Sequence, residues 1–235
     1  MLAYNLALVC GRFNLTRPSD IEERFGFMDW HERRIAPRFN IAPTQEILTI
    51  VQRADGGRAV QVATWGLVPL WMRDRPKPHI NARLETAAAS PMFRAAQRCL
   101  IPATGFYEWR SKMPMHIGLQ DGGLFVFAGL WLPGRHDGLP TATILTGPPN
   151  DLVAGIHNRM PAILRPDQEA AWLDASVADP FALLRPLPSE LMRAYAVVPL
   201  VNSVANDGPG LLEPAKVEQK ELFARPAVPP GAARG

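Results

Sequence analysis

The chain has 235 residues, of which 47% are hydrophobic and 20% are charged. This composition predicts a folded domain with a sizeable core, and it excludes an intrinsically disordered chain and a membrane-embedded one. No stretch approaches the roughly 18 consecutive apolar residues of a membrane span. The apolar run 1–9 lacks the basic start of a signal peptide. We therefore expect one soluble domain.

Charge is spread unevenly along the chain. Residues 1–118 contain 16 Lys and Arg against 10 Asp and Glu, whereas residues 119–235 contain 9 against 12. The first half is therefore basic and the second acidic. A basic half is compatible with a polyanionic partner, although a solvated surface of mixed charge is the commoner cause of such an imbalance.

The counts of a few residue types restrict the fold further. Proline and glycine together make 42 residues, which favours short strands and many turns over a helix bundle. The two cysteines, Cys10 and Cys99, are too few for a disulfide framework and indicate a reducing, cytoplasmic compartment. No cofactor and no metal are expected, because four of the histidines show no ligand spacing: His31, His79, His116 and His136.

The elements predicted in the first third of the chain are a helix and a β-hairpin. The helix should begin near Pro18, where Ser19 and Glu22 have the spacing of a capping box, and end near Gly26. The turn sequence 54–57 should join strands 46–53 and 59–65 into a hairpin.

Further strands are expected at 99–102, 106–110, 115–119, 124–130, 142–146 and 194–198. Short helices are expected at 91–98, 150–155, 167–174 and 189–193. Strands and helices do not alternate regularly, so we predict an α+β fold: a single domain around a curved, barrel-like, mainly antiparallel sheet with short flanking helices. The tail 226–235 should be disordered, because it has no pattern that could pack.

Four residues are candidates for a nucleophilic site: the thiol of Cys10, the amide of Asn81, the carboxylate of Glu108 and the imidazole of His157. Each also has an ordinary structural explanation. A single cysteine is most often a small buried hydrophobe, and Cys99 fits that description inside an apolar strand. Glu108 could face solvent by strand alternation, and His157 could be a loop residue.

Eight short motifs change the balance between these explanations. They resemble, in order, those of the SOS-response-associated peptidase family over about residues 10–207: Cys10–Phe13, Phe39–Thr44, Trp65–Pro69 with Trp71, Asn81–Thr86, Arg98–Pro102, Gly105–Trp109, Phe127–Trp131 and His157–Pro161. Each motif alone is weak, but eight in the same order are specific.

The resemblance implies a sensor of abasic sites in single-stranded DNA that forms a covalent DNA–protein crosslink through a cysteine at the mature N-terminus. By position, Cys10 would be the nucleophile, with Asn81, Glu108 and His157 around it. DNA contacts would come from Arg12, Asn40, Trp65, Trp71 and Arg83, whose guanidinium groups suit phosphates and whose indoles suit bases. The protein would be a monomer in the cytoplasm, associated with the nucleoid when bound to damaged DNA, without a membrane partner.

This chemistry explains why the cysteine must be N-terminal. An α-amine condenses with the open-chain sugar aldehyde to an imine, and the thiol on the adjacent carbon closes a five-membered thiazolidine. Ring closure is intramolecular and therefore favoured. Glu108 is a suitable general acid and base, His157 can bond the sugar oxygen, and Asn81 can hold the amine.

The N-terminus departs from the family pattern, because nine residues precede Cys10 and make its nitrogen an amide. We predict a catalytic domain over 10–225 and an extension, 1–9, that is absent or removed. Either translation starts at Val9, since a GTG codon can initiate with methionine, or residues 1–9 are cleaved, which the protein itself could do. Two alternatives stay open: a cysteine peptidase using Cys10 and His157, and a non-catalytic single-strand-binding module.

Overall fold

The computed structural model describes residues 10–26, 35–72, 77–134 and 138–216. The predicted extension 1–9 and tail 226–235 lie outside these ranges. Two sheets make up the described part. The first has five strands in the order β13 (Met192–Ala196), β8 (Met113–Leu119), β7 (Gly105–Arg110), β1 (Phe13–Leu15) and β2 (Arg38–Ile41).

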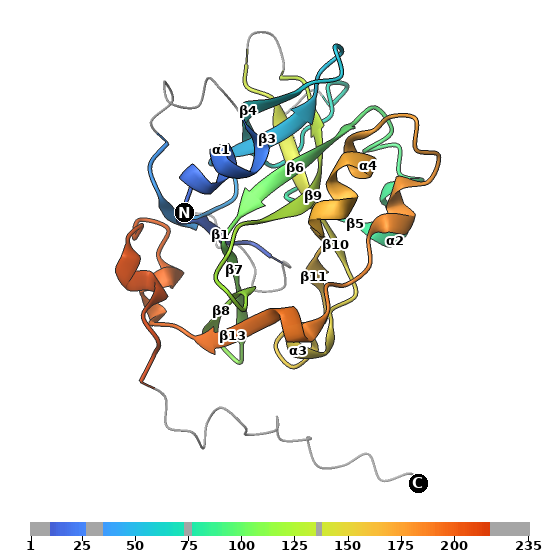
Figure 1. Cartoon of the computed structure of the whole chain (residues 1–235). Coiled ribbons are helices and arrows are strands. Elements are labelled where there is room, and N and C mark those ends of the chain that lie inside the picture. The colour runs from blue at the N-terminus through green and yellow to red at the C-terminus, as the bar shows by residue number, and fades with distance from the viewer. Residues whose placement is uncertain (1–9, 27–34, 73–76, 135–137, 217–235) are drawn as a thin grey trace, which may run out of the picture.

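The second sheet has eight strands and curves back on itself (Figure 1). Its order is β11 (Met160–Pro161), β10 (Thr141–Gly147), β4 (Arg58–Trp65), β3 (Glu46–Gln52), β6 (Gln97–Ala103), β9 (Phe125–Leu132) and β12 (Ile163–Leu164), and β5 (Asn81–Arg83) pairs with β10. Because β9 also pairs with β10, the strands β10, β4, β3, β6 and β9 form a closed ring of pairings. Apart from the parallel pairs β10–β4 and β10–β5, the pairings between these strands are antiparallel.

Short helices flank the sheets, as predicted. The α-helices are α1 (Ser19–Phe25), α2 (Leu84–Ala87), α3 (Asp151–Ala154) and α4 (Glu169–Leu173). Single 3₁₀ turns are η2 (Pro166–Gln168), η3 (Pro180–Leu183), η4 (Ser189–Leu191), η5 (Pro199–Asn202) and η6 (Pro209–Leu212). None of the helices in the described ranges has the length and apolar character needed to cross a bilayer. The α+β class and the curved, mainly antiparallel sheet are confirmed.

Several local predictions hold and others are wrong. The hairpin of β3 and β4 is present, and α1 ends at Gly26, whose φ of +67° gives the left-handed cap that glycine favours. The capping box is wrong, because Pro18 occupies the N-cap and no side chain caps the helix. The helix at 91–98 is also wrong: the chain makes separate turns there and enters β6 at Gln97.

Other differences concern boundaries near the C-terminal end of the domain. The helix expected at 189–193 is reduced to the 3₁₀ turn η4, and the strand expected at 194–198 begins at Met192. The helix expected at 167–174 is divided into η2 and α4. These shifts of a few residues leave the order of elements unchanged.

Aromatic side chains join the two sheets in one core. Phe13 of β1 meets the edges of Trp65 and Phe127, with ring centroids 5.1 and 5.7 Å apart. Phe106 of β7 lies 6.1 Å from Phe127. Trp65 has no exposed surface, and its indole N–H donates to the carbonyl of Ile80 over 2.9 Å. The core therefore fixes β1 and β7 of the first sheet against the second sheet.

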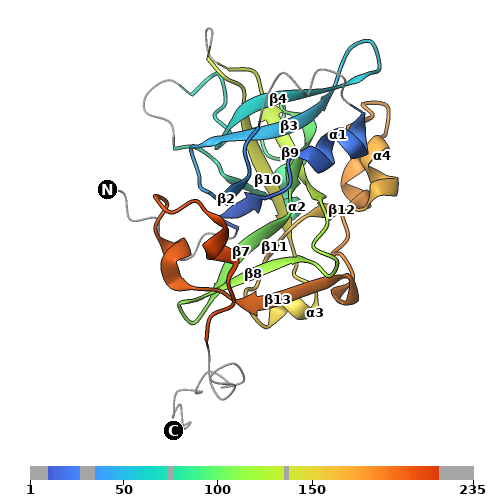
Figure 2. The ribbon, with the colours of Figure 1, turned by 60° about the vertical axis from the view of Figure 1, so that its left-hand side comes forward.

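A C-terminal segment, residues 197–212, covers the outer face of the first sheet beside β2 and β7 (Figure 2). Asn40 fastens it, because its amide nitrogen donates to the carbonyls of Val201, Ser203 and Asn206 at 3.2, 2.9 and 2.8 Å. Asp207 adds a carboxylate that accepts from the backbone N–H of Asn40 over 3.1 Å. The segment is thus held to β2 by polar contacts at its centre and end.

Replacing Asn40 should therefore destabilise the fold. Asn40→Ala leaves several inward-facing carbonyls without their donor, and we expect a loss of about 2 kcal/mol in the free energy of unfolding. Urea denaturation measures this loss, and Val204→Ala, in the same segment but with a largely exposed side chain, serves as the control. A change below about 0.5 kcal/mol for Asn40→Ala would contradict the assigned role.

Candidate functional site

Cys10 and Glu108 form the centre of the candidate site. The backbone nitrogen of Cys10 donates to Oε1 of Glu108 over 2.6 Å. Cys10 precedes β1, and Glu108 lies on the adjacent strand β7, where Phe13 is paired with Phe106. Cys10 has no exposed surface and Glu108 is only 2% exposed. The sequence thus brings together two residues 98 positions apart by pairing two short motifs.

Burial determines the protonation of this pair. Desolvation raises the pKa of Glu108 to about 8, although the hydrogen bond from Cys10 lowers it. Desolvation, with a smaller contribution from the charge of Glu108, raises the pKa of the Cys10 thiol well above its usual value. The thiolate is therefore disfavoured, whereas Glu108 can hold or release a proton near neutral pH.

Cys10 also has an unusual backbone conformation. Its φ of +42° lies in the left-handed region, which costs a residue with a side chain about 1–2 kcal/mol. This angle is defined by the carbonyl carbon of the preceding residue. The conformation is therefore strained only while a peptide bond joins Cys10 to residue 9.

His157 lies on the turn after α3 and has a fixed ring orientation. The backbone N–H of Arg159 donates to its Nδ1 over 3.2 Å. Nδ1 also lies 3.4 Å from the carbonyl oxygen of Arg159, so either tautomer of the ring finds a partner there. No hydrogen bond joins His157 to Cys10 in the described parts of the chain, so the paired arrangement of a Cys–His peptidase is not formed.

Asn81 and Arg83 are two positions apart on β5, so their side chains point to the same side of the strand. Through β10 they come near the His157 motif, because Thr146 is paired with Arg83 on one side and with Pro161 on the other. Trp65 connects this group to Cys10, since it packs on Phe13 and holds Ile80, the residue before Asn81. The buried indole of Trp65 therefore packs next to both groups of candidate residues: the group at Cys10, and the group formed by Asn81 and Arg83 on β5.

The predicted DNA-contact residues divide into exposed and internal ones. Trp71 is 63% exposed and Arg83 is exposed, so both are available to a ligand. The structure contradicts this role for Trp65 and Asn40, which are buried and bonded internally. Arg12 is half-buried, and its Nη1 donates to Asn40 over 2.7 Å and to the carbonyl of Val201 over 2.8 Å, so part of its guanidinium group is already occupied.

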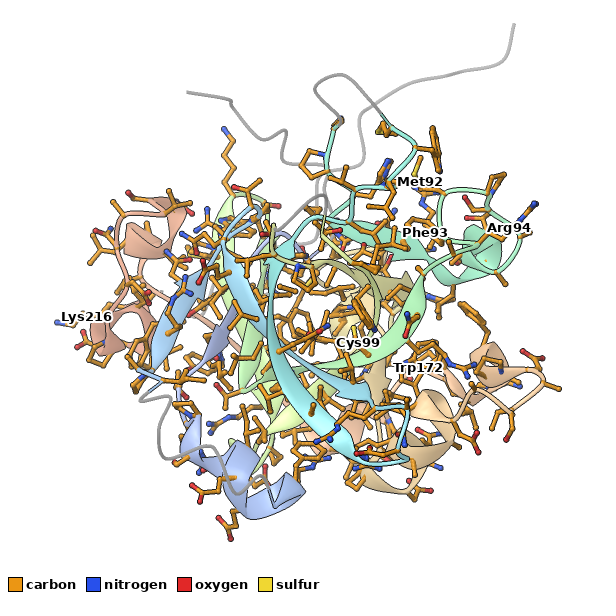
Figure 3. All side chains as sticks on the ribbon, turned by 90° about the horizontal axis from the view of Figure 1, so that it is seen from above. Met92, Phe93, Arg94, Cys99, Trp172 and Lys216 are labelled. Atoms are coloured by element: carbon orange, nitrogen blue, oxygen red, sulfur yellow. The ribbon has the colours of Figure 1, made fainter. Side chains whose placement is uncertain are left out.

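Cys99 is as buried as Cys10 but lacks its contact with a carboxyl group. It is buried within β6, and its carbonyl accepts from the indole N–H of Trp172 over 3.0 Å (Figure 3). Desolvation alone raises the pKa of its thiol. No carboxylate or histidine is bonded to it among the described residues. Cys99 is therefore a packing residue.

An apolar cavity of about 460 Å³ extends along the sheet face that carries Glu108. Met115, which is paired with Glu108, and Ala196, which is paired with Met115, line one wall, and Ile156 of the turn before His157 lines the other. The row Glu108, Met115, Ala196 leads from the buried carboxyl toward the edge of the sheet. No group of three metal-ligating side chains occurs in the described ranges.

Two residues next to the site were not predicted as functional. Arg159 belongs to the His157–Pro161 motif, and its guanidinium group forms a two-point ion pair with Glu85, at 2.5 and 2.9 Å. Both lie inside motifs that the sequence displays, but motif membership does not reveal that they contact each other. Their pairing depends on the adjacency of β5, β10 and β11.

The fold and the site define a cysteine-centred domain in which a buried carboxyl contacts the cysteine nitrogen. The family model described as SOS response associated peptidase matches residues 9–204, so the chain belongs to this family. It is 41% identical to "Abasic site processing protein YoqW" of Bacillus subtilis, over 87% of this chain and 99% of the relative. It is 30% identical to "Abasic site processing protein YedK" of Escherichia coli, over 75% and 84%. A crystal structure of a protein from Bacteroides thetaiotaomicron superposes with a TM-score of 0.74 at 26% identity, over 88% and 100%.

The raised pKa of Glu108 predicts a pH-dependent stability. A carboxyl whose pKa is higher in the folded state stabilises the fold when protonated, and this contribution is lost as the pH rises from about 4.5 through about 8. Relative to Glu108→Gln, the wild-type chain should lose about 4 kcal/mol of unfolding free energy between about pH 5 and about pH 9. Urea denaturation of both proteins at both pH values measures the difference, and parallel pH profiles would contradict it.

Proposed function

We propose that this protein senses abasic sites in single-stranded DNA and bonds covalently to them through the amine and thiol of Cys10. The contact between the Cys10 nitrogen and Glu108 carries the proposal, because it places an acid and base at the atom that must attack the sugar aldehyde. Relatives of matching length are named abasic site processing proteins, which supports the same substrate.

The reaction requires a free α-amine, so we propose that residues 1–9 are absent from the functional chain. The left-handed φ of Cys10 supports removal, because the strain disappears when the preceding peptide bond is gone. Either translation starts at Val9 or the chain cleaves itself. For self-cleavage, Sγ of Cys10 attacks the carbonyl of Val9 and the C–N bond breaks. The thiol proton passes through Glu108 to the departing nitrogen, and water hydrolyses the thioester.

In the proposed crosslinking reaction the amine acts first. It adds to the aldehyde carbon of the open sugar, neutral Glu108 protonates the hydroxyl of the adduct, and water leaves to give an iminium ion. The Cys10 thiol then adds to the same carbon and its proton returns to Glu108. One water is released in total, and the product is a thiazolidine. The carboxyl begins and ends the cycle in its protonated form.

Neighbouring residues have supporting roles in this proposal. His157 would bond the ring oxygen of the closed sugar through its Nε2 and assist its opening. Asn81 would orient the amine, and Arg83 and Arg12 would contact phosphates. Exposed Trp71 would stack on a base. The cavity begins at Met115, the residue paired with Glu108, and would offer room for part of the bound strand.

Protein beginning at Cys10 should form a heat-stable, denaturant-stable adduct with a single strand that contains an abasic site, and none with an intact strand. Cys10→Ala should abolish the adduct, whereas the matched Cys99→Ala should retain it within about a factor of two because Cys99 only packs. Glu108→Gln should slow its formation about a hundredfold. Denaturing gel electrophoresis measures all four proteins, and a full yield with Cys10→Ala would refute the proposal.

The origin of the free amine can be tested separately. Expressed from an ATG codon at Met1, the chain should lose residues 1–9 if it cleaves itself, and Cys10→Ala should keep them. If translation starts at Val9 instead, this chain stays intact and only the native gene yields protein that begins at Cys10. Intact mass spectrometry distinguishes the two routes. Native protein that retains Met1 and still crosslinks would contradict the requirement for a free amine.

A further inference from the structure

Arg159 presents a guanidinium group that is occupied by a carboxylate of the same chain. Its two amino groups donate to the two oxygens of Glu85 at 2.5 and 2.9 Å. The side chain of Arg159 is 14% exposed and that of Glu85 is 48% exposed. The positive partner is therefore embedded in the protein, whereas the negative partner reaches it from the surface.

Arg159 is held in place by contacts that do not involve Glu85. Nη2 also donates to the carbonyl of Thr146 over 2.5 Å. The backbone N–H of Arg159 donates to His157, which fixes the start of the side chain. Removal of Glu85 would leave the guanidinium group where it is, with its two-pronged edge open to another anion.

A phosphate can replace the carboxylate without rearrangement of the arginine. Both anions present two oxygens to the parallel N–H groups of a guanidinium fork. The position also fits a DNA strand, because Arg83, the exposed residue on β5 proposed to contact phosphate, acts electrostatically on the same carboxylate. A strand that passes the two arginines would meet the negative charge of Glu85 between them.

We infer that Glu85 occupies, in the DNA-free protein, the place on Arg159 that a phosphate of the bound strand takes. This inference rests on the proposed function and extends it to the selectivity of binding. Because Glu85 has to leave before the phosphate binds, the protein holds undamaged strands weakly. Retention on DNA then depends on the covalent bond formed at a lesion.

A double-mutant cycle tests the exchange. Non-covalent binding of an intact single-stranded oligonucleotide is measured by fluorescence anisotropy for wild type, Glu85→Gln, Arg159→Gln and the double variant. Glu85→Gln should bind about three- to fivefold more tightly than wild type, the range expected for breaking a partly exposed pair. In the Arg159→Gln background the same substitution should change affinity less than about 1.5-fold. Asp167→Asn controls for charge, because it opens another exposed arginine pair, with Arg165.

Three results would overturn the inference. Weaker binding by Glu85→Gln would mean that Glu85 positions Arg159 for DNA. Equal tightening in both backgrounds, or the same tightening by Asp167→Asn, would mean general repulsion. If wild type and all variants bind no intact strand and also form no crosslink with abasic DNA, the proposed function itself fails. If the protein crosslinks abasic DNA but the effects of the two substitutions on affinity simply add, the proposed function stands and only the exchange of Glu85 for phosphate is refuted.

The pH dependence of DNA binding provides a second test, in which Arg159 is not substituted. The hydrogen bonds from Arg159, assisted by the charge of Arg83, lower the pKa of Glu85 in the free protein. Exchange for phosphate removes the main partner, so the pKa rises in the complex and binding takes up protons. Wild-type affinity should therefore increase more than that of Glu85→Gln when the pH falls from about 5.5 toward about 4, the range around the usual pKa of a glutamate. Identical pH dependences of the two proteins would contradict the exchange.

Discussion

The contact between the Cys10 nitrogen and Glu108 is the constraint on which the rest of the site depends. A carboxyl that is almost completely buried is unfavourable unless it is neutral or has a hydrogen-bond partner, and here it has both means of compensation. The position is available only because β7 lies between β1 and β8, which keeps water from the carboxyl. The same exclusion of water gives Glu108 a pKa near the pH at which a proton donor and acceptor is most useful.

Trp65 transmits this constraint to the remainder of the molecule. Its ring packs on β1 next to Cys10, and its N–H holds Ile80 next to Asn81. The tryptophan thus sets the relative position of the two candidate groups without reaching the surface. The resemblance to a family placed Trp65 at the site, and the structure gives its presence there a physical reason that differs from stacking on a base.

The sequence predicted the parts of the fold whose pattern is local. The hairpin of β3 and β4 follows from alternating strands around a glycine turn, and most of the longer strands follow from apolar runs between turns. Strands of two to four residues, such as β1, β5 and β11, were not predicted, because they contain less than a full period of alternation and exist only through distant partners. The helix expected at 91–98 failed because its residues instead make turns before β6.

In the candidate site, too, the sequence could indicate some features and not others. Cys10, Glu108 and His157 could be singled out because reactive side chains stand inside specific motifs. The burial of Glu108 could not, since alternation around it allowed a solvent-facing carboxyl, whereas residues 105–108 are all buried because both faces of β7 are covered. Asn40 is a similar case: its role depends on carbonyls more than 160 positions away, and no local pattern contains that information.

Burial also decides the order of steps in the proposed reaction. A thiol whose pKa is raised by desolvation is a poor first nucleophile, because the reactive thiolate is scarce. The α-amine has no such handicap once it is free, and Glu108 contacts the nitrogen, not the sulfur. When the amine has formed the iminium ion, the positive charge beside the thiol favours its deprotonation, and the sulfur attacks an electrophile on its own residue. A buried, protonated thiol is therefore suited to the second step and poorly suited to general thiol chemistry, so the same burial that slows side reactions of Cys10 leaves its reaction with an aldehyde open.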